Sequence, residues 1–112
     1  MTPTTPDQLR AAFDELCTAG TAHAAATVAY AATYAAFIDS EAAIMRRGLD
    51  HLLGGTCDTA SSRRDAIQRT ATRLAVEDAD EQVRAFRVHL DSAQSRYNLR
   101  LAALPEVAGE GE

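Results

Sequence analysis

The chain has 112 residues, of which 46% are hydrophobic and only 5% aromatic, and its formal net charge is −5. This length predicts no more than one domain. The negative charge argues against indiscriminate binding to nucleic acid or to an anionic membrane surface.

The first predicted element is a long helix over about residues 6–53. A short polar arm, residues 1–5, precedes it, and we expect this arm to be disordered. Thr5 is placed as the N-cap, Pro6 occupies the first helical position, and Gln8 completes a capping box. These signals predict a defined helix start.

A heptad runs along this helix. The positions seven residues apart are Leu9, Leu16, His23, Tyr30, Phe37 and Ile44. The positions interleaved four residues after them are Phe13, Gly20, Thr27, Tyr34 and Glu41. This is coiled-coil spacing. Alanines around it, including Ala26, predict a face that another helix can approach closely.

A short breaker separates the first helix from the second. Gly54 and Gly55 suit a helix C-cap, and Ser62 and Asp65 form a second capping box. We therefore predict a loop over about residues 54–62 and a helix over about residues 63–104. Pro105 ends that helix, and residues 105–112 are predicted to be a disordered acidic tail.

The second helix has its own seam. Its regular positions are Val76, Val83, Leu90, Tyr97 and Leu104, with Ala79, Phe86 and Ala93 between them. Ile67, Ala71 and Leu74 fall on a shifted phase, which predicts a stutter near residue 75.

Together these elements predict an all-α fold, an antiparallel hairpin of two long helices with coiled-coil-like packing. A single seam leaves most side chains in water, so we expect self-association into a helical bundle or ring. The residues assigned to the helix or oligomer seam are Leu9, Leu16, Tyr30, Tyr34, Phe37, Ile44, Val76, Val83, Phe86, Leu90, Tyr97 and Leu104.

Residues that could support catalysis or bind a metal are few. The three histidines lie far apart in sequence, no Glu-x-x-His pair is present, and no glycine-rich phosphate loop occurs. Glu77, Asp78, Asp80 and Glu81 lack the spacing of a calcium loop. We expect a protein that is not an enzyme and that needs no cofactor or metal.

Two further features bear on location. Cys17 and Cys57 would be separated by most of the first helix, too far for an intramolecular disulfide, which is typical of a reducing compartment. The uncharged stretch from Leu16 to Ile38 is rich in Ala and Thr, and it is too weakly apolar to suggest a membrane span. No signal peptide is evident, so we expect a cytoplasmic protein.

The charge is unevenly distributed. Residues 46–73 contain six arginines against three aspartates, whereas the segments on either side are acidic. Folding as a hairpin would gather this basic block at the tip, where guanidinium groups could hold phosphates. The alternative is that the arginines pair with Asp50, Asp58 and Asp65 or serve solubility. The candidate nucleic-acid-binding residues are Arg46, Arg47, Arg63, Arg64, Arg69 and Arg73.

The pattern also resembles a group of small phage proteins built as long helical hairpins, some of which are likened to the phage recombination mediator. The likeness spans about residues 28–104. The stretches that carry it are residues 29–37, Ser40-Glu41-Ala42, Gly55-Thr56, Arg63-Arg64-Asp65-Ala66 and residues 77–86, followed by the leucines Leu99, Leu101 and Leu104.

This resemblance implies a ring-like homo-oligomer in the bacterial host that binds single-stranded DNA and works with a recombinase or a single-strand-binding protein. The chain departs from that pattern in being acidic, lacking lysine and having no aromatic residue beside the tip arginines to stack bases. Small secreted actinobacterial hairpins share the outline, but their Trp-x-Gly turn is missing here. The competing function is a helical protein–protein adaptor or assembly factor that never contacts nucleic acid.

Overall fold

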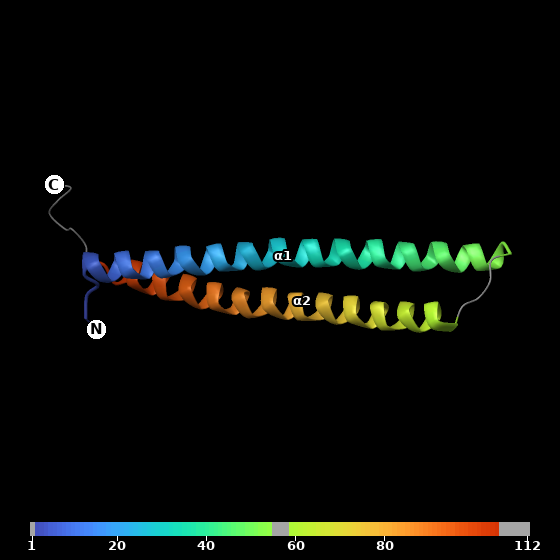
Figure 1. Cartoon of the computed structure of the whole chain (residues 1–112). Helices are drawn as coiled ribbons and strands as arrows, with labels where there is room; N and C mark the ends of the chain where they lie inside the picture. The colour runs from blue at the N-terminus through green and yellow to red at the C-terminus, as the bar shows by residue number, and fades with distance from the viewer. Residues whose placement is uncertain (1, 55–58, 106–112) are drawn as a thin grey trace. The chain divides into compact units, whose positions relative to one another are not determined.

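The computed structural model describes residues 2–54 and 59–105, and within them the chain is all-α. Helix α1 spans Pro6–Leu52 and helix α2 spans Thr59–Ala102 (Figure 1). The predicted hairpin of two long helices is therefore confirmed. The predicted acidic tail beyond Pro105 lies outside the described residues.

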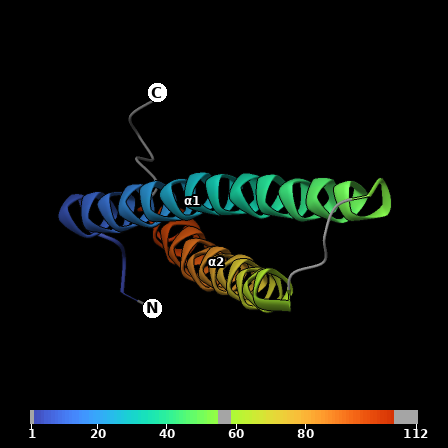
Figure 2. The same ribbon diagram turned by 45° about the vertical axis from the view of Figure 1, so that its right-hand side comes forward.

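The chain divides into two compact units, each containing a segment of both helices. Unit 1 combines residues 1–25 with 84–112, and unit 2 is residues 26–83. Within unit 2 the helices run antiparallel, since Glu41 pairs with Arg69 and the later Arg47 pairs with the earlier Asp65. The end of α1 and the start of α2 lie at the same end of this unit in both views (Figures 1 and 2).

Helix α1 begins at the predicted capping box. The Gln8 backbone N–H donates to the Thr5 hydroxyl at 3.2 Å, and the Thr5 N–H donates to the Gln8 side-chain oxygen at 3.0 Å. The arm before it is more ordered than predicted. Thr4 is only 2% exposed, and its N–H donates to the carbonyl of Ala103 at 3.0 Å. Because the last carbonyls of a helix lack partners within that helix, this bond satisfies one of them.

The end of α1 agrees with the sequence-based prediction, whereas the start of α2 does not. Gly54 has a positive φ of 111°, and its N–H donates to the His51 carbonyl at 3.2 Å, as expected of a glycine at a helix C-terminus. The capping box predicted at Ser62 is wrong, because α2 already begins at Thr59. Because Thr59, Ala60 and Ser61 are already helical, Ser62 lies within the first turn of α2 and is not its N-cap. Residues 55–58 lie outside the described part.

The seam between the helices is narrow and formed by small residues. Only Ala12, at 8% exposure, and Ala93, at 1%, are buried apolar residues among those described. In α1 the small residues that face α2 are Ala12, Ala19, Ala26, Thr33 and Ser40. Each lies three residues after a position of the predicted heptad that begins at Leu9. Small side chains occupy these positions because they let the two backbones approach closely. Of the predicted interleaved set, Phe13, Thr27 and Tyr34 are exposed and were one residue too late, whereas Gly20 and Glu41 are half-buried.

The aromatic residues of the predicted set pack at the edge of this seam instead. Phe13 is 49% exposed and Tyr34 is 45% exposed. The Phe13 ring lies 5.9 Å from that of Tyr97, and the Tyr34 ring lies 6.1 Å from Tyr30 and 6.2 Å from Phe37. Tyr34 is therefore the one residue of the predicted seam set that the structure leaves exposed.

The remaining eleven predicted seam residues are half-buried. In α2 the pattern follows the predicted phase, and Val76, Val83, Phe86, Leu90 and Tyr97 all lie on the side that is shielded from water. Ile67, Ala71 and Leu74, which fall on the shifted phase, are exposed. Before Val76, Asp65 and Thr72 are half-buried instead, and they keep the seven-residue spacing of Ala79, Phe86 and Ala93. The stutter predicted near residue 75 is therefore wrong.

Candidate functional site

Two of the six candidate arginines in unit 2 are held in ion pairs between the helices. The Arg47 guanidinium donates twice to the Asp65 carboxylate, from Nε at 3.3 Å and from Nη2 at 2.5 Å. Arg69 donates from Nε to Glu41 at 2.9 Å. Both pairs are partly exposed to solvent. These two arginines therefore bind partners within the fold. The Arg47 pair is one that the alternative interpretation of the basic block proposed, whereas Glu41 was not among the expected partners.

The ion pairs shift the protonation equilibria of their members. The hydrogen bond from Arg47 lowers the pKa of Asp65 against the opposing effect of partial desolvation, and the charges of Arg47, Arg64 and Arg69 lower it further. The hydrogen bond to Asp65 raises the pKa of Arg47, and the bond to Glu41 raises that of Arg69. Each pair is thus stabilised in its charged form.

This shift predicts a pH-dependent contribution to stability. The pKa of Asp65 is lower in the folded state than in the unfolded chain. Asp65 therefore stabilises the fold at pH values above its ordinary pKa of about 3.9, and this stabilisation is lost as the pH falls through the folded-state pKa. We expect Asp65→Asn to lower the melting temperature at neutral pH and to match the wild type in acid. Asp50→Asn, which removes a charge outside the pair, is the control. A constant difference at every pH would contradict this account.

The other four candidate arginines remain exposed. Within residues 2–54 and 59–105, Arg46, Arg63, Arg64 and Arg73 form no ion pair. Arg64 and Arg47 line a hollow of about 460 Å³ with Asp65, Ser61, Ile67 and Gln68. The structure thus brings two of the six arginines to one hollow, but the Asp65 carboxylate lines it too and is bonded to Arg47.

A second heptad of apolar residues runs along α1 in unit 2, and all of its members are exposed. We call it the outer stripe. It consists of Val28, Ala31, Ala35, Ile38, Ala42, Met45, Leu49 and Leu52. The side chain of Leu52 is 83% exposed, that of Met45 is 68% exposed and that of Leu49 is 53% exposed.

The outer stripe faces away from α2. From Val28 to Leu49, its residues lie two positions from a residue on the side of α1 that faces α2, as Val28 does from Tyr30 and Ala35 from Phe37. Two residues turn an α-helix by roughly 200°. Helix α1 of unit 2 is therefore apolar on two opposite faces, and α2 covers only one of them.

Sequence reasoning missed this stripe. The available signal was the alternating spacing of three and four residues from Val28 to Leu52, with an apolar residue at every step. The first heptad contains the larger aromatic residues, whereas the stripe has none and includes three alanines among its eight residues.

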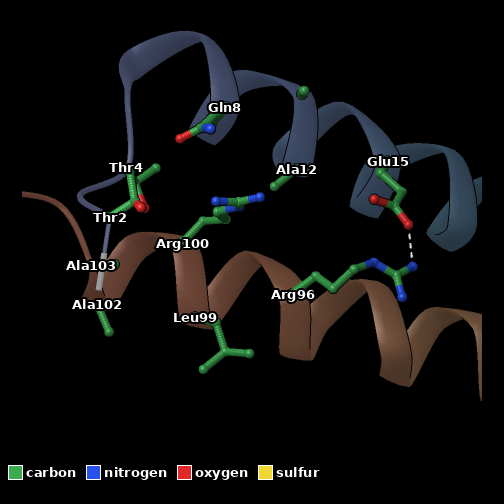
Figure 3. Close-up of a pocket in the computed structure, with 11 residues that line it drawn as sticks. Thr2, Thr4, Gln8, Ala12, Glu15, Arg96, Leu99, Arg100, Ala102 and Ala103 are labelled. Atoms are coloured by element: carbon green, nitrogen blue, oxygen red, sulfur yellow. Dashed lines mark hydrogen bonds and ion pairs between the residues drawn. The ribbon is translucent and has the colours of Figure 1, made fainter.

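A groove of about 610 Å³ lies in unit 1 between the first turns of α1 and the last turns of α2. Figure 3 shows Arg100 directed from α2 toward α1, and Arg96 paired with Glu15. Thr4 lines this groove, and its hydroxyl is buried without a hydrogen-bond partner among the described residues.

The described residues offer few other sites. They contain no group of three His, Cys, Asp or Glu side chains that could hold a metal ion. Neither helix includes a described stretch that is long and apolar enough to cross a membrane. Comparisons with known protein families, with curated proteins and with solved structures found no match. The class defined by the fold is therefore the two-helix hairpin itself.

Proposed function

We propose that this protein is a helical adaptor or assembly module that binds another helix along the outer stripe of α1. The observation that carries the proposal is the exposure of eight apolar residues in an uninterrupted heptad. Apolar surface of this kind, organised in a line, is typical of an interaction site, and the heptad spacing is that of a coiled-coil contact. An amphipathic helix is the matching partner.

Site-specific photo-crosslinking in the bacterial cell tests this function. A benzophenone amino acid replacing Ala42, within the outer stripe, is expected to give a defined higher-mass product after irradiation. The same group at Ala36, which is exposed but outside the stripe, is the control. Adding Leu49→Glu should remove the Ala42 product, because a carboxylate cannot be buried unpaired in an apolar contact. Equal products from Ala42 and Ala36 would refute the proposal.

A second candidate function is binding of single-stranded DNA, as in the phage recombination mediators that the sequence resembles. The observation that favours it is the set of four exposed arginines that form no ion pair in the described part of the chain. Each could hold a backbone phosphate. In this function the protein would act in DNA recombination beside a recombinase or a single-strand-binding protein.

Fluorescence anisotropy of a labelled single-stranded oligonucleotide, titrated at several salt concentrations, tests this second function. Binding through phosphates should weaken steeply with salt. Arg63→Glu with Arg64→Glu should reduce the slope of log affinity against log salt by about 1.4, since each phosphate contact to a single strand contributes about 0.7. Arg10→Glu with Arg87→Glu, in unit 1, makes the same change of net charge. No binding at low salt would eliminate this function.

A further inference from the structure

The outer stripe has an internal asymmetry that specifies its occupant. Three of its first five residues are alanines, whereas its last three are Met45, Leu49 and Leu52. A helix that packs along it in close contact must therefore present large side chains at one end and small ones at the other. The outer stripe itself has that pattern when its direction is reversed.

We infer that the outer stripe binds the outer stripe of a second copy of this chain, with the two α1 segments antiparallel. This inference rests on the proposed assembly function and names its partner. In the register that we assign, Ala35 lies opposite Leu52 of the second copy. Ile38 lies opposite Leu49, and Ala42 lies opposite Met45. Twofold symmetry repeats these contacts and gives six layers, four of which pair an alanine with a large side chain.

Charge selects the same arrangement. Asp39 and Arg46 flank the outer stripe on one edge, are exposed, and form no ion pair within the described residues. In the assigned register Asp39 is offset by two residues, roughly 3 Å along the axis, from Arg46 of the second copy. The twofold axis makes this pair twice.

The other edge of the stripe carries no conflicting charge. Glu41 lies there, but its carboxylate is already bonded to Arg69 at 2.9 Å and is turned toward α2. The residue nearest to Glu41 across the contact is Gly48 of the second copy, which leaves room for this pair.

A parallel arrangement fits less well. In register, it would place alanine opposite alanine and leucine opposite leucine, which leaves gaps in some layers and crowds others. It would also bring together the two arginine-rich turns of unit 2, whose exposed members include Arg63 and Arg64. Repulsion between like charges opposes that contact.

Analytical ultracentrifugation of the purified full chain across a concentration series tests the inference. We expect a monomer–dimer equilibrium that Leu49→Glu weakens at least a hundredfold, because two charges would be buried without partners. Ala36→Glu, which lies outside the stripe, should leave the equilibrium unchanged. Circular dichroism of both variants should retain the helical spectrum. A wild-type chain that stays monomeric at the highest concentration would overturn the inference.

A reciprocal charge swap tests the register. Arg46→Asp is expected to weaken the dimer at least fivefold, since both ion pairs become repulsive, and Asp39→Arg added to it should restore the affinity. Failure of the double variant to recover would overturn the antiparallel register. The two proposals can be told apart. If the chain is monomeric but the Ala42 crosslink still captures a different protein, the dimer is refuted and the adaptor function is not.

Discussion

Ala93→Leu is expected to lower the free energy of unfolding by about 1–3 kcal/mol, the typical cost of inserting extra methylene groups into a filled contact. Ala93 is 1% exposed and lies on α2 within unit 1. A leucine there must either leave its favoured rotamer or push the helices apart. Urea denaturation followed by circular dichroism measures the change.

Ala85→Leu is the matched control for this substitution. Ala85 lies on the same helix and in the same unit, but it is exposed. Leucine and alanine differ little in helix propensity, so the control should unfold close to the wild type. If both variants lost the same stability, the seam at Ala93 would not be tightly packed.

Gly54→Ala is expected to lower the free energy of unfolding by about 1–3 kcal/mol, the range for a residue held in a sparsely populated backbone conformation. The φ of Gly54 is 111°, a value that a side chain at Cβ disfavours strongly. Thermal unfolding followed at the helical band measures the loss.

The opposite sign is expected for the same substitution at Gly48. This residue lies inside α1, and a Cβ built there meets no atom within 4 Å. Alanine should raise the free energy of unfolding by about 0.5–1 kcal/mol, because glycine is a poor residue for a helix interior. Similar effects at the two glycines would show that backbone conformation does not decide the outcome.

The fold could be predicted because its signals are local and strong. Pro6 and the Thr5–Gln8 capping box set the start of α1, and glycine ends it, so both boundaries fall close to those predicted. The start of α2 was misplaced because Thr59, Ser61 and Ser62 are all residue types that occur at N-caps, so the sequence offers more than one start for this helix.

The phase of the α1 seam could not be read in the same way. A period of seven residues is satisfied whether the second position follows the first after three residues or after four. Large aromatic residues favoured the wrong choice, and close packing of Ala12 against α2 favours the right one. Asp65 could be proposed as a partner for the arginines, but its pairing with Arg47 and the pairing of Arg69 with Glu41 depend on which residues of two distant segments meet.

The hydrogen bond from Thr4 to Ala103 has a consequence for engineering. It brings the residues just before α1 next to the end of α2, so the described chain enters and leaves unit 1 at the same place. The two ends could be joined by a short linker and the chain reopened between Gly54 and Thr59. The permuted protein would keep both helices intact while reversing their order.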